Sequence, residues 1–484
     1  MNPSTSLLIA LLLPVVAIPI IALLGKRPNL REGVTLTTGG LLFLNAINLV
    51  GPLLDGQRPM LVLAEMLPGL SLTLELEPLG LLFALLASGL WIITSLYAIG
   101  YMRSHQEQNQ TRFYAFFALA IGAVQGVALA GNLLTLFIFY EILTFATYPL
   151  VTHHGTPEAQ RRGRIYLGIL LGTSFFFLLL AIILTWHLTG TLDFRAGGIL
   201  AGQADGLLLG VLLALYAFGI GKAALMPFHR WLPAAMVAPT PVSALLHAVA
   251  VVKAGVFAIL KVVVYVFGLD LLNETNVNTW LVYVAGGTII VASLVALTQD
   301  NLKARLAYST IGQLSYIVMG AALANGWGVI GGSLHIVAHA FAKITLFFCA
   351  GAIMAALHKN AVSQMKGIGR QMPLTMTAFF IASVSIIGLP PTGGMWSKWF
   401  LILGGLEAEQ YVAVGILMLS SLLSISYLIP IVVKAFFFPA QDDAGVKEAP
   451  TPCIIALTLT ALGCLALFLY PDPLQTLLRL MGVF

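Results

Sequence analysis

The feature that most constrains this chain is a succession of apolar stretches, each about 20 residues long, joined by short polar links. That length is what an α-helix needs to cross the hydrocarbon core of a bilayer. The 484 residues are 59% hydrophobic and only 9% charged, a composition outside the range of water-soluble domains. We therefore predict an all-α polytopic membrane protein with about fourteen transmembrane helices, near residues 5–24, 33–53, 78–101, 112–130, 133–151, 165–186, 206–226, 242–268, 279–298, 305–323, 327–356, 372–390, 410–435 and 452–470.

The basic residues of the polar links predict the orientation. Lys and Arg concentrate in the cytoplasmic loops of membrane proteins. With the N-terminus outside, the outer links hold only Arg58, Arg195 and Arg479. The inner links then hold Lys26, Arg27, Arg31, Arg103, Arg112, Arg161, Arg162, Arg164, Arg230, Lys303, Arg305, Lys359, Lys366, Arg370, Lys434 and Lys447. We expect a multi-pass protein of the cell (plasma) membrane whose N-terminus lies outside and whose first apolar segment is retained as a span.

The remaining lysines lie inside apolar sequence. A lysine near the bilayer centre costs about 2.5 to 3.5 kcal/mol on insertion scales. Such residues need polar partners or a hydrated interior, and they mark ion pathways more often than structural pairs. The set consists of Lys222, Lys253, Lys261, Lys343 and Lys398.

Two apolar stretches are interrupted by prolines, at Met226–Pro233 and at Gly388–Gly394. Proline removes a backbone donor, and in a membrane the freed groups are tolerated where protein or a cavity surrounds them. Paired breaks in two halves of a chain indicate an inverted repeat. We expect N-terminal helices in 1–111, a first repeat of five helices in 112–268, a second in 279–435, broken seventh and twelfth helices, and a C-terminal helix in 452–484.

Glu141 lies in the middle of the fifth predicted span, with no other acidic residue in that span. A structural ion pair between helices would explain it, but a functional site is the more common role of an ionisable residue at this depth. Lys222 is the natural partner because it lies at a similar depth on another span. Opening or closing such a pair would change the affinity of Lys222 for its proton.

His335, His339 and Lys343 follow one another at intervals of four, which places them on one face of the eleventh span. Histidine titrates near neutral pH, so this line of residues suits a proton relay. Two alternatives remain open. The His-x-x-x-His spacing also occurs in zinc sites, although no glutamate follows the first histidine, and both rings could simply be satisfied in the core.

On the eighth span, His247 and Lys253 are six residues apart and therefore contact different neighbours. Lys261 lies nearer the outer end, where its long side chain would extend to the interface and act as an anchor. At the inner end of the tenth span, Lys303 and Arg305 are expected to be solvated charges.

The sequence contains no motif for a nucleotide cofactor and no complete metal-binding motif. Gly219–Lys222 ends like a phosphate-binding loop, but Ala223 follows where Ser or Thr is required. There is no G-x-G-x-x-G after a strand and no C-x-x-C, and Cys349, Cys453 and Cys464 lack metal spacing. Scattered basic residues argue against nucleic acid. We expect no catalytic site, no cofactor and no metal.

The same residues carry a family resemblance across roughly residues 110 to 430. The chain resembles the antiporter-like membrane subunits shared by respiratory complex I (NADH-quinone oxidoreductase) and the Mrp-type multisubunit Na+/H+ antiporters. The motifs that carry it are Lys222–Pro233, Ala238–His247, Val252–Gly255, Gln299–Gln313, His335–Lys343 and Gly388–Lys398.

The resemblance implies fourteen spans, two inverted five-helix repeats and a charged axis along the membrane midplane. In that family the glutamate of the fifth span pairs with the lysine of the seventh, and protons pass along lysines and histidines of later spans. Carried over by motif, and with His247 added from the residues alone, the predicted proton pathway comprises Glu141, Lys222, His247, Lys253, His335, His339, Lys343 and Lys398.

Two departures favour the smaller D-type subunit of the Mrp antiporters. Few residues follow the last span, so the lateral helix of the largest complex I relative is not expected, and Lys398 stands where another relative has glutamate. Three functions are compatible with the fold: Na+/H+ antiport, proton pumping in a redox complex or membrane-bound hydrogenase, and solute permeation, which lacks an aromatic-lined polar site here. The expected partners are other membrane subunits, protons, Na+ and the lipid bilayer.

Overall fold

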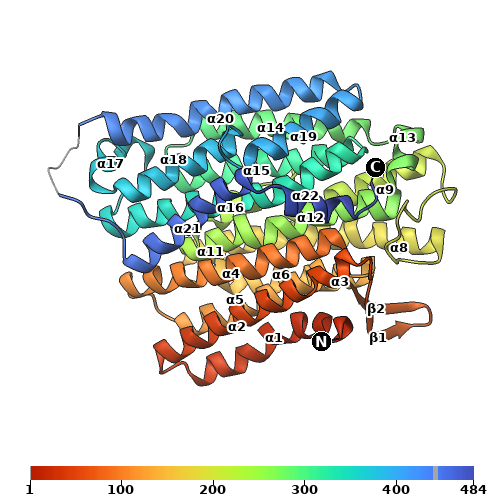
Figure 1. Ribbon diagram of the computed structural model, residues 1–484, viewed down its shortest axis with the longest axis horizontal. Helices are drawn as coiled ribbons and strands as arrows, with labels where there is room; N and C mark the ends of the chain where they lie inside the picture. The colour runs from red at the N-terminus through yellow and green to blue at the C-terminus, as the bar shows by residue number, and fades with distance from the viewer. Residues whose placement is uncertain (1, 440–444, 484) are drawn as a thin grey trace.

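The computed structural model describes residues 2–439 and 445–483. The helices lie side by side as one bundle, with the N-terminal helices along one edge and α20 along the opposite edge (Figure 1). A β-hairpin projects at one end of the bundle, and the short helix α17 lies at the other end (Figure 1). The chain is thus a polytopic all-α membrane protein with one small extramembrane hairpin.

The N-terminal part contains three long helices and the hairpin. Its strands pair antiparallel across a Pro68-Gly69 turn, and this hairpin falls in a segment that the span pattern treats as a link. The elements are α1 (Pro3–Leu23), α2 (Pro28–Asn48), α3 (Val50–Leu54), β1 (Met60–Leu67), β2 (Leu70–Glu75) and α4 (Pro78–Ser104).

The middle part contains five further spans, several of them interrupted. Its elements are α5 (Gln110–Ala128), α6 (Leu133–Val151), α7 (Pro157–Thr173), η1 (Ser174–Leu178), α8 (Leu179–Thr189), α9 (Gly206–Gly219), η2 (Gly221–Ala223), α10 (Trp231–Ala234), η3 (Ala235–Val237), α11 (Thr240–Ala244), η4 (Leu245–Val249), α12 (Val251–Val262) and η5 (Val263–Phe267). Of the short segments, η1, η4 and η5 are π-helical turns within longer helices, a feature frequent at functional sites.

The last part begins with a short surface helix and ends with an amphipathic one. Its elements are α13 (Leu269–Thr275), α14 (Thr279–Thr298), α15 (Leu302–Ala322), α16 (Gly326–Leu357), η6 (Val362–Gln364), α17 (Ile368–Gln371), α18 (Pro373–Ile387), α19 (Gly394–Glu407), α20 (Tyr411–Phe437), α21 (Thr451–Leu469) and α22 (Asp472–Arg479).

Each predicted span falls on a described helix or a run of helices. Among the described residues, 11 helices or runs are long and apolar enough to cross a membrane, and α9 and α18 are shorter apolar helices. Helix α15 is 21 residues long and carries Lys303 and Arg305 in its first turn. The main difference in boundaries is that the second and sixth spans begin earlier than predicted, at Pro28 and Pro157, where proline supplies the first helical residue.

Both predicted helix breaks are present. Helix α9 ends at Gly219, earlier than expected, so Lys222 lies inside the break rather than before it. Helix α18 ends at Ile387, and the chain restarts as α19 at Gly394. Gly388 adopts a φ of +88°, a left-handed conformation that favours glycine.

Helices α6 and α15 begin in the same way. Asn132 caps α6 by accepting from the Thr135 amide at 2.8 Å, and Asn301 caps α15 by accepting from Ala304 at 3.0 Å. Each asparagine also forms an isolated β-bridge to the segment that follows the next span, to Asp193 and Ala361 respectively. Helix α6 is the fifth predicted span and α15 the tenth, so these matching starts lie at opposite ends of the bundle.

The centre of the bundle is formed by two runs of helix. Every residue from Thr240 to Phe267 is buried, and α16 contacts α4, α11, α12, α15, α18, α19 and α21. Five of the eight predicted pathway residues lie on these two runs. By contrast, α1 and α21 are each only 33% buried over their most apolar windows and carry none of the eight, so the ionisable side chains avoid the lipid-facing helices.

Candidate ion pathway

The break after α9 is held open by side chains that satisfy its free backbone groups. The Trp231 indole donates to the Gly221 carbonyl at 2.9 Å, and the Lys222 amide donates to the Tyr140 hydroxyl at 3.0 Å. Gly255 of α12 packs directly against the backbone of Lys222, and a Cβ there would lie 2.7 Å from the Lys222 carbonyl oxygen. The backbone of Lys222 is therefore fixed, and the residue is fully buried. None of these contacts constrains its side chain.

The Lys222 ammonium contacts α6 but does not form the predicted ion pair with Glu141. It donates to the Tyr140 carbonyl at 2.7 Å and to the Thr144 hydroxyl at 2.6 Å, and it lies 3.1 Å from the centre of the Tyr140 ring. No salt bridge joins it to Glu141 among the described residues. The predicted pairing is thus wrong for this conformation, because a carbonyl and a hydroxyl on the adjacent face of α6 satisfy the ammonium instead.

Glu141 itself is 7% exposed, and neither carboxylate oxygen has a hydrogen-bond partner within the described residues. Unsatisfied buried carboxylates are rare because the desolvation penalty is large. Glu141 stands one residue from Tyr140 and three from Thr144, on the same turn of helix. Its charge acts on Lys222 from there, so a shift of the lysine side chain would give both groups a partner.

The face of α16 predicted from the i, i+4, i+8 spacing is present. His335 and His339 have ring centres 5.8 Å apart, and Lys343 follows one turn later. The Lys253 ammonium of α12 makes a close contact with Nδ1 of His339, whose Nε2 is buried without a partner in the described chain. These contacts join the eighth and eleventh spans through two titratable groups.

His335 extends this chain of contacts toward α19. Its Nδ1 lies 2.9 Å from the Ser397 hydroxyl, and its Nε2 lies 3.1 Å from the Gln313 amide oxygen. The Tyr316 ring stacks on His335 with centres 5.3 Å apart, and the Lys398 ammonium lies 4.9 Å from the centre of that same ring. Tyr316 therefore bridges the histidine line to Lys398.

The Lys398 side chain satisfies a free backbone carbonyl at the second helix break. Its ammonium donates to the Ile387 carbonyl at the end of α18 (2.8 Å) and to the Ser421 hydroxyl of α20 (2.9 Å). Its aliphatic stem packs on Gly388, where a Cβ would lie 3.1 Å from the lysine Cε. A cavity of about 310 Å³, lined by Lys398, Ser421 and apolar residues of α19 and α20, adjoins this ammonium.

Lys343 and His247 occupy two further polar positions in the core. The Lys343 ammonium donates to Ser309 at 2.6 Å, and Ser309 lies 2.9 Å from the Tyr427 hydroxyl. His247 lies in the π-helical turn η4, 4.7 Å from the Phe347 ring centre, with neither ring nitrogen hydrogen-bonded to any described residue. The structure thus places Lys343 in a satisfied network and His247 at a position with unused hydrogen-bonding capacity.

Two residues outside the predicted pathway differ from their predicted roles. Lys261 does not extend to the interface, because it is 1% exposed and forms a 3.0 Å ion pair with Glu77. Arg305 is not solvated, because its guanidinium donates to the carbonyls of Gln299 and Tyr427. Glu77 and Tyr427 come from distant parts of the chain, at positions that the local sequence pattern does not reveal.

A polar cavity of about 600 Å³ opens at the end of the bundle opposite the hairpin. Charged side chains from three segments line it, among them His154, Glu158, Arg162 and Lys303. Lys303 is half-buried there and donates to the Ala238 carbonyl at 2.7 Å. The sequence pattern missed this vestibule because its lining residues are ordinary loop and helix-end charges that only the fold brings together.

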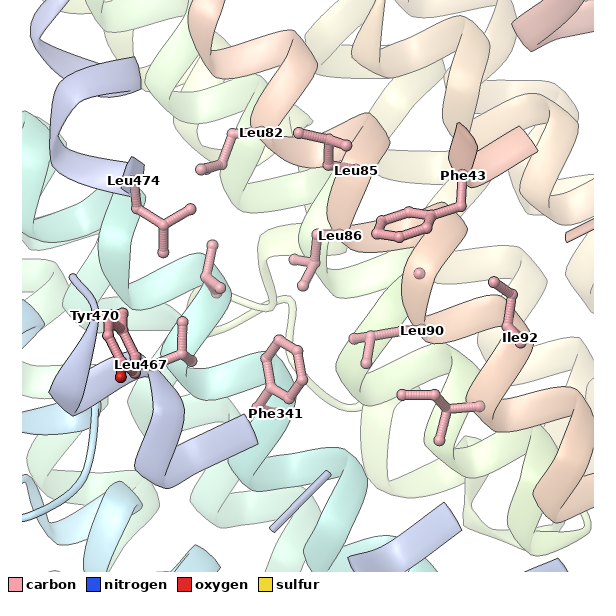
Figure 2. Close-up of a pocket in the computed structure, with 13 residues that line it drawn as sticks. Phe43, Leu82, Leu85, Leu86, Leu90, Ile92, Phe341, Leu467, Tyr470 and Leu474 are labelled. Carbon is pink, nitrogen blue, oxygen red and sulfur yellow. The ribbon is translucent and has the colours of Figure 1, made fainter. Parts of the chain in front are cut away.

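A second cavity of about 450 Å³ has a different character. It lies between α2, α4, α16, α21 and α22, and leucine and phenylalanine side chains such as Leu86, Phe341 and Leu467 point into it (Figure 2). Tyr470 supplies the single side-chain hydroxyl among its lining residues (Figure 2). With no carboxylate, ammonium, guanidinium or imidazole among its lining residues, this groove is not a continuation of the polar line.

A comparison with known families agrees with these contacts. Residues 130–424 match the family described as "NADH:quinone oxidoreductase/Mrp antiporter, TM". The chain belongs to this family. The matched range contains all eight predicted pathway residues and both helix breaks, so the resemblance predicted from the motifs is confirmed at the level of the family.

Relatives in this family come from complex I and from antiporters. NADH-quinone oxidoreductase subunit N of Desulforudis audaxviator is 32% identical over 90% of this chain and 89% of that protein. The A/B subunit of a probable K(+)/H(+) antiporter of Rhizobium meliloti is 31% identical over 83% of this chain but only 40% of that protein. The chain spans about half or less of the larger antiporter and subunit 5 relatives that it matches.

Solved structures of the family share the fold. A chain of the Mrp complex from Dietzia sp. superposes with a TM-score of 0.87 at 22% identity, covering 100% of this chain and 97% of that one. A chain of the membrane-bound sulfane sulfur reductase, an archaeal respiratory membrane complex, gives a TM-score of 0.85 at 24% identity, covering 98% and 96%. The protein is thus an antiporter-like membrane subunit of the complex I and Mrp family.

Proposed function

We propose that this chain is the proton-translocating subunit of a multisubunit membrane complex that exchanges a monovalent cation, Na+, for protons. The observation that carries the proposal is the series of contacts from Lys253 through His339 and His335, and across the Tyr316 ring, to Lys398. Each of these groups takes up or releases a proton, and all are shielded from lipid by other helices. Such a line conducts protons better than it binds a solute.

The eight predicted residues divide into two groups under this proposal. Glu141 and Lys222 form a charge switch at the first helix break, and the remaining six carry protons from the eighth span into the second half of the bundle. Between the two groups, Gly255 keeps α12 against the Lys222 backbone, so movement at the break is transmitted to the helix that bears Lys253.

We also infer that residues 112–268 and 279–435 are inverted repeats. The matching asparagine caps and β-bridges at the starts of α6 and α15 support this division. Residues 1–111 and 452–484 then form flanking helices. The predicted orientation, with the N-terminus outside the plasma membrane, rests on the distribution of Lys and Arg in the links.

A second function is open to a direct test, namely proton pumping in a redox-driven complex. The 32% identity to an NADH-quinone oxidoreductase subunit over nearly the whole of both chains favours it. The 31% identity to a probable K(+)/H(+) antiporter subunit over 83% of this chain supports antiport, for which we propose a smaller, D-type subunit. Mass spectrometry of the natively purified complex separates the two, because flavin or iron–sulfur subunits would contradict antiport, and small membrane subunits alone would contradict redox pumping.

The central residue of the pathway is Lys222. We expect Lys222→Ala to abolish cation-driven proton movement in inverted membrane vesicles without loss of the assembled complex, because alanine keeps the backbone contact with Gly255 and removes the side chain beyond Cβ, including the ammonium. Glu141→Gln should also impair proton uptake. Wild-type transport in the Lys222→Ala complex would refute the proposed function.

A further inference from the structure

A buried ion pair lies outside the pathway described above, at the end of the bundle that carries the β-hairpin. The Lys261 ammonium of α12 is 3.0 Å from Oε1 of Glu77, the residue that caps α4, and 3.0 Å from the Ala130 carbonyl. On α12, Lys253, Phe257 and Lys261 follow at intervals of four and share one face. Lys261 is thus the continuation of the face that bears Lys253.

The pair opens into a cavity of about 340 Å³. Arg58, Glu75, Glu77, Lys261 and Tyr265 supply its polar lining. Arg58 is exposed and donates to the Leu480 carbonyl at 3.0 Å, so the cavity reaches the surface of the protein. The wall therefore carries both acids and bases between bulk water and the ion pair.

The charges around the cavity are nearly balanced. Glu75, on β2 outside the membrane, is half-buried, and this burial raises the pKa of its carboxyl group. Lys261 and Arg58 oppose that rise, whereas Glu77 and Asp193 reinforce it. Balanced acids and bases suit proton exchange rather than retention of a metal cation.

Within the described chain, only one of the two carboxylate oxygens of Glu77 accepts hydrogen bonds of normal geometry. Oε1 accepts both the Gly80 amide at 3.0 Å and the Lys261 ammonium, whereas Oε2 is buried without a hydrogen-bond partner among the residues described. The Tyr265 hydroxyl already interacts with this carboxylate, although no hydrogen bond of normal geometry reaches Oε2 from the described part of the chain. A purely structural pair would be expected to satisfy both oxygens, because an unpaired buried carboxylate oxygen is costly.

The surroundings of Lys261 hold its ammonium in place. The rings of Phe194, Tyr265 and Phe257 lie 4.1, 5.3 and 5.8 Å from it. Phe257 also packs on Phe83 of α4, with ring centres 5.0 Å apart. This aromatic pair stands between Lys253 and Lys261, whose positions are about 12 Å apart along the helix.

We propose that Glu77 and Lys261 form a second proton-exchange site, through which protons pass between the Lys253 side of α12 and water in the cavity at the predicted outer face. The inference rests on the proposed function. In the exchange, an N–H bond of the Lys261 ammonium breaks and an O–H bond forms on Oε1 of Glu77, the oxygen that the ammonium contacts. The carboxylic acid then gives its proton to cavity water, which restores the carboxylate, and the proton leaves as hydronium. A proton released by the Lys253 ammonium and relayed by water past the aromatic pair between the two lysines forms a new N–H bond on the Lys261 amine. Lys253 regains a proton from the His339 side of the pathway.

The substitution Lys261→Arg tests this site without removing its charge. Arginine preserves the ion pair with Glu77 but does not deprotonate in proteins. In inverted vesicles that contain the whole complex, we expect the initial rate of cation-driven proton movement per assembled complex to fall about tenfold or more, as for loss of a proton-transfer group. Glu65→Gln, which changes an exposed carboxylate of the same hairpin, should leave the rate unchanged.

A double variant covers the case in which arginine does not fit and the complex fails to assemble. Glu77→Gln with Lys261→Met removes both charges, so that neither is left buried and unpaired, and it should assemble and transport as poorly as Lys261→Arg. A wild-type rate in any assembled variant lacking a titratable Lys261 would overturn the inference. If the wild-type complex moves no protons, the proposed function fails instead, and Lys222→Ala in the same preparation marks the rate of an inactive pathway.

Discussion

Replacing Thr144 by valine tests whether Lys222 moves between two sets of partners. In the structure the Lys222 ammonium is bound to the Tyr140 carbonyl and the Thr144 hydroxyl, and Glu141 is left without a partner in the described chain. Valine has nearly the shape of threonine but offers no hydroxyl. The substitution therefore removes one of the two hydrogen bonds that hold the lysine away from the carboxylate.

The size of the effect follows from the contacts. Hydrogen bonds to charged groups contribute about 1.5 to 3 kcal/mol each, so the two together supply about 3 to 6 kcal/mol. A Lys–Glu pair at about 4 Å contributes about 4 kcal/mol at an effective dielectric constant of 20. The two arrangements are thus close in free energy. Loss of the Thr144 bond shifts the equilibrium toward the Glu141 pair by about 10- to 150-fold.

The assay is the initial rate of cation-driven proton movement in inverted vesicles, normalised to the amount of assembled complex. If transport requires Lys222 to leave Glu141 in each cycle, the Thr144→Val complex should turn over at least about tenfold more slowly. Thr144→Ser keeps the hydroxyl and should remain close to wild type. A wild-type rate in Thr144→Val, or equal impairment of the serine variant, would refute the two-position account of Lys222.

Two further predictions concern packing and pH. Gly255→Ala should reduce both assembly and transport, because the new Cβ would press on the Lys222 backbone. Overpacking of this kind costs about 1 to 3 kcal/mol or more. The matched control is Gly287→Ala, on an open face of α14, which should be neutral. His153 lies just after α6, and burial, with smaller contributions from Arg112 and His154, lowers its pKa to about 4. Because this folded-state pKa is depressed below the ordinary value of about 6.5, the contribution of His153 to stability is present above pH 6.5 and is lost as pH falls toward 4. The thermal unfolding temperature of the purified complex should therefore fall over this pH range. In His153→Gln that pH-dependent fall should be smaller.

The sequence predicts two features of the fold well: the number and length of the membrane spans, which the bilayer thickness determines, and the helix starts that proline marks. A span needs about 20 apolar residues, and Pro28, Pro157 and Pro373 mark helix starts because the first helical residue needs no amide donor.

The hairpin at Met60–Glu75 leaves a weaker signal. Pro68-Gly69 marks a turn and Leu70–Glu75 alternates apolar and polar residues, but Met60–Leu67 consists mostly of residues that also favour helices. Span length alone does not reveal the hairpin.

The partners of buried charges were harder to predict, because the competing choices lie on one helical turn or far away in sequence. Opposite charge favours Glu141 as the partner of Lys222, yet Tyr140 and Thr144 on the neighbouring face hold the ammonium in this conformation. Lys261 pairs with a residue 184 positions earlier, whose role as a helix cap gives no hint of that pairing. Local periodicity correctly aligned His335, His339 and Lys343, because all three lie on a single uninterrupted helix.

The hydrogen bonds of His335 link its protonation to the second helix break. Ser397 has one hydroxyl proton, and its oxygen lies 3.0 Å from the Gly394 carbonyl as well as 2.9 Å from Nδ1 of His335. If His335 is protonated on both nitrogens, it donates to Ser397 and to the Gln313 oxygen, and Ser397 is free to donate to Gly394. If Nδ1 is unprotonated, the Ser397 hydroxyl must turn toward it and release the Gly394 carbonyl at the start of α19. Under the proposed function, each proton that passes His335 therefore makes or breaks a bond in the first turn of the helix that carries Lys398.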